Sequence, residues 1–150
     1  MTGIKGSNYY EGILQLRNCT KDAVIFVRNK IKKEEGVWIA KEAEVKGGTD
    51  IYLSSNKFLK KVAKQLKERF QGIMKASSKL YTVNKQTGKK VYRGTMLFRM
   101  PSFRKGNMGI FKGDKVKILS IGDKVMLQDT MTGKKRQCKF EEVDKSFRVL

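Results

Sequence analysis

The segment between Ser55 and Gly72 has the clearest periodicity in the chain, and it predicts an amphipathic helix. Ser55 is a natural N-cap, and Gly72 stands just after the expected end. Apolar side chains recur at the spacing that places them on one helical face: Phe58, Leu59, Val62, Ala63, Leu66 and Phe70. A helix with one apolar face must bury that face, so the flanking segments should supply the layer that covers it.

Alternating and β-branched runs on either side of this helix predict the strands of a sheet. Five ranges have this character: 9–17, 37–45, 50–54, 74–83 and 91–100. In the first of them, Tyr10, Leu14 and Leu16 are expected on one face, because side chains alternate along a strand. The run 46–48 predicts the turn between the second and third ranges, and the polar run 84–88 predicts the turn between the last two.

A second helix is expected to begin after Thr20, a plausible N-cap, and to end near Glu35, before Gly36. Its apolar run at 23–27 is β-branched and fits a strand equally well. We favour the helix because the polar sequence RNKIKKEE follows without a break. The order is then βαββαββ. Its first six elements match a ferredoxin-like split βαβ, an antiparallel sheet with two helices on one face, which the last hairpin extends.

Pro101, the single proline, predicts a boundary between an α+β ferredoxin-like domain at 1–100 and a second domain at 101–150. Glycines punctuate this second part of the chain. Short strands are expected over four ranges: Lys115–Ile121, Lys124–Asp129, Lys135–Phe140 and Ser146–Val149. Several short strands with glycine turns are typical of a small SH3-like or OB-like β-barrel.

Charge is distributed unevenly along the chain. No acidic residue lies between Glu68 and Asp114, whereas that window contains eleven lysines and arginines. The net charge of the whole chain is +20. A large field of one sign repels itself, so this distribution suggests a polyanionic partner, most commonly nucleic acid. A general lysine bias and an anionic membrane surface are the alternatives.

The predicted helix at 55–72 carries lysines on the face opposite its apolar stripe. They are Lys57, Lys60, Lys61, Lys64 and Lys67. Like charges four residues apart repel each other, and a face made for stability would interleave acids. A plain solvated face is the alternative interpretation, but the neighbouring acid-free stretch favours a surface that faces phosphates.

Ten further cationic side chains complete the predicted RNA contacts. They lie in the predicted hairpin, at the domain junction and on the second domain: Lys85, Lys89, Lys90, Arg93, Arg99, Arg104, Lys105, Lys134, Lys135 and Arg136. In the strand at 91–100, Arg93 and Arg99 alternate with apolar side chains, which makes one face of that strand basic. Arginine can bond a phosphate through two N–H groups, whereas lysine acts as a point charge.

The sequence offers no constellation of residues for catalysis or metal binding. Histidine, the commonest general base, is absent, and no nucleophile or phosphate-cradling motif occurs. Cys19 and Cys138 stand far apart without a neighbouring cysteine, which excludes a zinc finger. We therefore expect no enzyme, no cofactor and no metal. A nuclease that uses lone acids and a metal is the enzymatic alternative.

Nothing in the sequence predicts a membrane segment or a leader. No apolar run approaches the roughly 18 residues that a membrane span requires. Residues 1–8 lack the apolar centre of a signal peptide. We expect a cytoplasmic protein without membrane contact.

Three stretches, in this order and spacing, resemble a known family. They are YYEGILQLR at 9–17, VKGGTDIYLSS at 45–55 and SSKLYTVNKQTGKKVYRGTMLFRMPSFRKG at 77–106. Together they resemble the archaeal-type members of the Nmd-three family, whose eukaryotic members are adaptors that load onto the large ribosomal subunit for export. The segment at 111–140 is also similar to the C-terminal β-domain of that family.

The resemblance implies association with the large ribosomal subunit near its tRNA exit site and joining face, in late maturation or in control of subunit joining. Its implied partners are ribosomal RNA and neighbouring ribosomal proteins, for a chain that we expect to be monomeric when free. The zinc-binding region of the family, built on CxxC pairs, has no counterpart in this sequence, so we expect a fragment or a natural short form. A general nucleic-acid-binding protein without ribosome specificity is the alternative.

Overall fold

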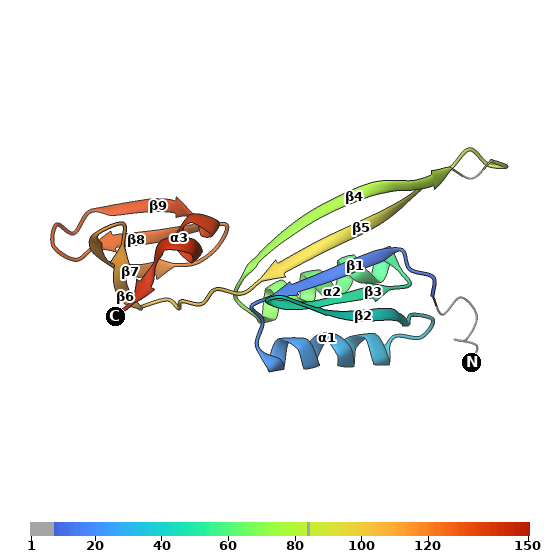
Figure 1. The fold of residues 1–150 in the computed structure, drawn as a ribbon, viewed down its shortest axis with the longest axis horizontal. Coiled ribbons are helices and arrows are strands. Elements are labelled where there is room, and N and C mark those ends of the chain that lie inside the picture. Colours follow the sequence, from blue (N-terminus) through green and yellow to red (C-terminus); the bar gives the residue numbers. More distant parts are fainter. Residues whose placement is uncertain (1–7, 84) are drawn as a thin grey trace. The chain divides into compact units, whose positions relative to one another are not determined.

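The computed structural model describes residues 8–83 and 85–150, which form two compact units (Figure 1). The first unit comprises the chain up to Phe70 together with Met74–Met100, and the second comprises Gln71–Ile73 together with Pro101–Leu150. The described residues contain three helices and two five-stranded sheets. The predicted mixed α+β class is therefore confirmed.

The first unit follows the predicted order of strands and helices. Its elements are β1 (Gly12–Arg17), α1 (Lys21–Lys33), β2 (Ile39–Val45), β3 (Gly48–Leu53), α2 (Asn56–Arg69), β4 (Ile73–Val83) and β5 (Lys90–Arg99). Both helices begin at the expected caps. The Thr20 hydroxyl accepts a hydrogen bond from the Ala23 N–H at 3.3 Å, and the Ser55 hydroxyl accepts one from the Phe58 N–H at 3.1 Å. Each cap satisfies a backbone donor that the first helical turn leaves without a partner.

The sheet of the first unit has the strand order β2-β3-β1-β5-β4. β1 runs antiparallel to β3 but parallel to β5, with Gly12 opposite Gly94 and Arg17 opposite Arg99. The expectation of an antiparallel sheet is therefore wrong for one pair of strands. β4, the strand that follows α2, lies at the edge of the sheet. The β4–β5 hairpin then places β5 beside β1.

Both helices pack on one face of this sheet. Leu14 and Leu16 of β1 and Phe98 of β5 are fully buried there, in one cluster with apolar side chains of α1 and α2. The α2 stripe is buried as predicted at Phe58, Leu59, Val62, Ala63 and Leu66, while Phe70 packs against the cluster. This burial holds α2 in one orientation, so its opposite face is turned to solvent.

Tyr10 does not join Leu14 and Leu16 in this core, contrary to the prediction. Regular pairing begins only at Gly12, and the Glu11 carboxylate accepts a hydrogen bond from the Asn56 N–H at 2.8 Å. Glu11 thus points toward the start of α2, and Tyr10 lies on the other side of the sheet, where its ring contacts Tyr52. The alternation of β1 cannot be extended backwards past the first paired residue.

The second unit contains a smaller sheet and one short helix. Its elements are β6 (Met108–Phe111), β7 (Asp114–Ser120), β8 (Lys124–Asp129), β9 (Lys135–Lys139), α3 (Phe140–Ser146) and β10 (Arg148–Val149). The strand order is β10-β6-β7-β8-β9, and neighbouring strands are antiparallel. Ile73 is buried in the core of this unit with four phenylalanines, Phe103, Phe111, Phe140 and Phe147.

The sequence prediction of the second unit missed β6 and α3. The predicted strand 135–140 ends at Lys139, because Phe140 begins α3, and the predicted strand 146–149 is reduced to Arg148–Val149. Phe140 and Val143, three residues apart, are both buried, so one turn of helix puts both side chains into the core.

Candidate nucleic-acid interface

The lysine face of α2 is the first component of a basic surface on the first unit. All five predicted lysines, Lys57, Lys60, Lys61, Lys64 and Lys67, are exposed. The first turn of α2 contains no acidic residue. Lys61 lies 3.6 Å from the Glu34 carboxylate, an exposed pair that contributes little stability. The buried stripe on the opposite side fixes these lysines as one row of charges.

The β4–β5 hairpin is the second component. Both strands extend past the ends of β1, β2 and β3 (Figure 1). The tip lysines Lys85, Lys89 and Lys90 are exposed, as are Lys75 and Lys79 on β4. Gly88 takes a positive φ of 72° in the turn, while Asn84, the first residue of the predicted turn, lies outside the described residues. The hairpin therefore presents positive charge along its length and at its tip.

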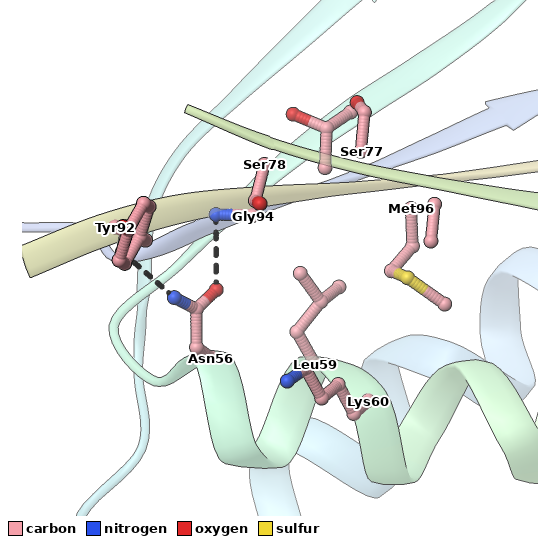
Figure 2. A pocket seen from close by; sticks show the side chains of 10 residues that line it. Asn56, Leu59, Lys60, Ser77, Ser78, Tyr92, Gly94 and Met96 are labelled. Carbon is pink, nitrogen blue, oxygen red and sulfur yellow. Dashed lines mark hydrogen bonds between the residues drawn. The ribbon is translucent and has the colours of Figure 1, made fainter. Parts of the chain in front are cut away.

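A pocket of about 390 Å³ lies where α2 meets the hairpin (Figure 2). Lys60 of the lysine face lines it together with Ser77, Ser78 and Tyr92 of the hairpin. Asn56 closes one end, and its side-chain amide binds the backbone of β5 (Figure 2). Of the predicted RNA contacts, Lys60 lines this pocket, and the hairpin contributes neutral side chains to it.

Arg93 and Arg99 lie apart from the tip lysines. The Arg93 Nε donates a hydrogen bond to the Tyr10 carbonyl at 3.1 Å, and its guanidinium lies 3.9 Å from the centre of the Tyr10 ring. Arg99 is paired in register with Arg17, whose side chain lies on the face of the sheet that carries Asp50. Both predicted arginines therefore belong to the sheet face opposite the two helices.

The remaining predicted contacts belong to the second unit and are all exposed: Arg104, Lys105, Lys134, Lys135 and Arg136. Arg104 begins a turn in which its backbone N–H donates to the Asn107 side-chain oxygen at 2.7 Å. The Arg136 guanidinium lies 5.2 Å from the centre of the Phe111 ring and 3.5 Å from the Asp114 carboxylate. Arg136 is thus partly engaged within its own unit.

Sequence reasoning missed Tyr52 and Lys41, which lie with Arg93 and Arg99 on the sheet face opposite the two helices. The Tyr10 and Tyr52 rings meet edge to face with centroids 4.9 Å apart, and the Lys41 ammonium lies 5.5 Å from the centre of the Tyr52 ring. The alternation of β3 could have indicated Tyr52, because Ile51 and Leu53 on either side of it are buried. The contact with Tyr10 depends on strand order, which the sequence did not provide.

The Cys19 thiol of the first unit is partly buried. Burial raises the pKa of the Cys19 thiol to about 11, and its sulfur lies 3.7 Å from the Phe98 carbonyl oxygen. This thiol is therefore protonated at neutral pH and is a poor nucleophile. Within residues 8–83 and 85–150, no group of three or more His, Cys, Asp or Glu side chains could hold a metal ion. No helix in the same part of the chain is long and apolar enough to cross a membrane.

Comparison with known proteins gives one family match. The family model described as NMD3, second domain, matches residues 9–100 of this chain. No curated protein matched the chain. The matched segment spans more than half of the 150 residues, and it contains the lysine face of α2, the β4–β5 hairpin and Arg99. The resemblance seen in the sequence is confirmed over 9–100, while the likeness at 111–140 stays a prediction, and the chain belongs to the NMD3 family.

Proposed function

We propose that this chain is an RNA-binding factor that associates with the large ribosomal subunit, in subunit maturation or in control of subunit joining. Membership of the NMD3 family supports a ribosome-related factor of large-subunit biogenesis or export. The observation that carries the proposal is that the matched segment, 9–100, also bears the exposed lysine face and the basic hairpin. One unit therefore combines the family identity with a surface suited to a polyanion.

The α2 lysines and the hairpin have different tasks in this proposal. The row from Lys57 to Lys67 supplies positive charge along one side of the unit and contacts successive phosphates. The tip lysines Lys85, Lys89 and Lys90 reach RNA farther from the body of the unit. The pocket at Asn56 and Lys60 lies between α2 and the hairpin, so in this proposal one RNA passes from the α2 lysines to the hairpin.

The second unit adds a further set of contacts in the proposed complex. We assign residues 1–100 to a ferredoxin-related domain and residues 101–150 to a small SH3-like barrel. The barrel assignment is supported by the strand order β10-β6-β7-β8-β9 and by the short helix before the last strand. Lys134 and Lys135, both exposed, extend the RNA contact, together with Arg104 and Lys105.

The proposed role is that of an adaptor, which binds without catalysing a reaction. NMD3 proteins are ribosome-associated adaptors, and this supports a non-enzymatic function for the chain. The proposed partners are ribosomal RNA and adjacent ribosomal proteins in the cytoplasm. The protein binds as a monomer and requires no cofactor.

The proposal is tested by co-sedimentation with separated small and large ribosomal subunits over a salt series. Saturable one-to-one binding to large subunits, persisting at salt concentrations that release the protein from small subunits, is the expected result. A protein held by charge alone loses roughly 10³–10⁵ in affinity between about 50 and 200 mM salt. Equal binding to both subunits, lost at the same salt concentration, would instead identify a general nucleic-acid-binding protein.

A further inference from the structure

The sheet of the first unit has an open face opposite α1 and α2. Strand register places ten side chains on it: Ile13, Gln15, Arg17, Lys41, Ala43, Asp50, Tyr52, Thr95, Leu97 and Arg99. Lys41 is exposed and the others are partly exposed. Tyr10 and Arg93 join this face through their contacts with each other and with Tyr52. The open face mixes aromatic, aliphatic and cationic side chains.

Four of these side chains form a continuous strip of rings and cations across the sheet. Lys41 lies 5.5 Å from the Tyr52 ring, Tyr52 lies 4.9 Å from Tyr10, and the Arg93 guanidinium lies 3.9 Å from the Tyr10 ring. The hydrogen bond from Arg93 Nε to the Tyr10 carbonyl holds that guanidinium in place. Aromatic rings and guanidinium planes are the groups on which proteins stack unpaired bases.

A hollow of about 380 Å³ lies beside this strip. Tyr10, Ile13, Leu80, Thr95, Lys79 and Arg93 line it. The lining offers a ring and two aliphatic side chains for a flat apolar surface, a hydroxyl for a polar edge and two cations for a phosphate. Its volume falls within the range of about 300–1,000 Å³ that holds small-molecule ligands. The hollow thus offers side chains that can contact a base and a phosphate.

The charge on the open face favours an anionic ligand. Among the described side chains of this face, Asp50 is the one acid, and the Arg17 guanidinium neutralises it at 2.7 Å. The partly buried position of this pair, with 16% and 13% of the side chains exposed, keeps it from competing for a ligand. Lys41, Arg93 and Arg99 leave the face positive.

We infer that the open face binds unpaired nucleotides of RNA, with bases against the Tyr10, Tyr52 and Arg93 planes and phosphates beside Lys79 and Lys41. RNA as the ligand rests on the proposed function. The open face adds a preference that the α2 lysines do not have, because point charges on a helix contact phosphates of paired and unpaired strands alike. An acidic protein surface would satisfy the cations but would leave the Tyr10 and Tyr52 rings, which meet edge to face, and the hollow without a matching group.

The test compares a labelled oligouridylate of about 12 nucleotides with an RNA duplex of similar length. The length of the oligouridylate lies within the usual site sizes for single strands. Binding is measured by fluorescence anisotropy at several salt concentrations. The double variant Tyr10→Leu, Tyr52→Leu removes the rings and retains apolar side chains, and Tyr10→Phe, Tyr52→Phe is the matched control. Arg93→Lys keeps the charge but removes the planar group, and it provides a second variant if the leucine pair destabilises the fold.

The leucine pair should lose about tenfold or more in affinity for the oligouridylate, since stacking contributes substantially per base. Its affinity for the duplex and its salt dependence should stay unchanged, and the phenylalanine pair should bind like the unmodified protein. An equal loss on both probes, or no loss on either, would overturn the inference. Displacement of the oligouridylate by polyglutamate, with a loss of polyglutamate binding in the leucine pair, would identify an acidic protein site instead.

The inference and the proposed function fail in different ways. If the unmodified protein shows no preference for large subunits but the ring variants still lose the oligouridylate selectively, the proposed function is wrong and the inference holds. If large subunits bind well and the ring variants leave both RNA probes unaffected, the inference is wrong and the proposed function holds.

Discussion

Asn56 and Gly94 are joined by a hydrogen bond that leaves no room for a side chain on the glycine. The Asn56 side-chain oxygen accepts from the Gly94 N–H at 3.2 Å, and a Cβ on Gly94 would lie 2.9 Å from that same oxygen. A Cβ on Gly12, the partner of Gly94 in the sheet, would lie 2.7 Å from it. Two glycines on adjacent strands thus make the space in which one amide links α2 to β5 (Figure 2).

Replacement of Asn56 by alanine should loosen this link. The substitution removes the bond to Gly94 and the bond that the Asn56 amide donates to the Tyr92 carbonyl at 2.9 Å. We expect the free energy of unfolding to fall by about 0.5–1.5 kcal/mol, the usual net contribution of a hydrogen bond, because the Gly94 N–H keeps the Glu11 carbonyl as a partner and the Tyr92 carbonyl is open to water. Urea denaturation followed by circular dichroism measures this change.

Asn56→Asp is the matched control for that experiment. The carboxylate can still accept from the Gly94 N–H, but its second oxygen faces the Tyr92 carbonyl and it lies beside the Glu11 carboxylate. At neutral pH the aspartate variant should therefore lose at least as much stability as the alanine variant, although it keeps the volume of the side chain. Equal stability of the alanine variant and the unmodified protein would show that the link is dispensable.

Gly48→Ala should be among the most destabilising single substitutions in the first unit. A Cβ at this position would lie 1.8 Å from the Leu16 carbonyl oxygen, so β1 and β3 would have to separate locally. We expect a loss of about 3 kcal/mol, at the upper end for overpacking. Gly36→Ala is the control, because Gly36 has a φ of 77° but open space around it, and its cost should be about 1–2 kcal/mol. Similar thermal midpoints for the two variants would contradict this ranking.

Neutralising part of the α2 lysine face should weaken RNA binding without unfolding the protein. The triple variant Lys60→Gln, Lys64→Gln, Lys67→Gln removes three exposed charges and no buried side chain. Each lost phosphate contact reduces the slope of log affinity against log salt by roughly 0.7–0.9. We expect a slope shallower by about 2 and weaker binding to large subunits.

A control variant with the same change in charge separates local contact from net charge. Lys21, Lys32 and Lys33 are exposed on α1, and their replacement by glutamine also removes three charges. The α1 variant should keep the salt slope of the unmodified protein. If both triple variants weaken binding equally, overall charge governs the interaction and the α2 face has no special role.

Cys19 should react slowly with iodoacetamide in the folded protein. Burial raises the pKa of its thiol from 9.0 to about 11, so at about pH 8 its thiolate fraction is about 100-fold smaller than that of an unshifted thiol. Alkylation of a Cys138→Ser variant, followed by mass spectrometry, isolates Cys19. Its rate should keep rising toward pH 11, and the same protein in urea should react rapidly. A rate that levels off near pH 9 would contradict the shift.

The raised pKa of the Cys19 thiol also determines how the stability of the folded protein changes with pH. Between pH 9.0 and about 11, the unfolded chain releases the Cys19 proton while the folded chain retains it. The folded state then binds more protons, so stability falls as pH rises through that window. Below pH 9.0 this group contributes no pH dependence.

The elements of the first unit could be predicted because local signals specify them. Thr20 and Ser55 cap helices wherever a helix follows, and the stripe from Phe58 to Leu66 requires one buried face. The position of β5 beside β1 could not be predicted. β5 pairs with β1 across more than 70 residues of chain, and the glycines that leave room for Asn56 at this pairing, Gly12 and Gly94, are equally far apart in the sequence.

The candidate interface was predictable to a similar degree. Exposed lysines opposite a buried stripe follow from helical geometry, so Lys57 to Lys67 were found from spacing alone. The contact between Arg93 and Tyr10 could not be found from spacing. Glu11 turns toward Asn56, and this places the Tyr10 side chain on the opposite side of the sheet from the one that the alternation predicts. In the second unit, β6 was missed because its burial alternates over four residues only.

The parallel pairing of β1 with β5 also governs the order in which the first unit can form during synthesis. β1 ends at Arg17, whereas its partner is complete only at Arg99. Until then α1, β2, β3 and α2 can assemble against one edge of β1 while the other edge has no partner. An unpaired edge is a template for association with other chains, and pairing across such a separation is slow. The closing of the β4–β5 hairpin onto β1 is therefore the step that covers this edge and leaves β2 and β4 as the edges of the sheet.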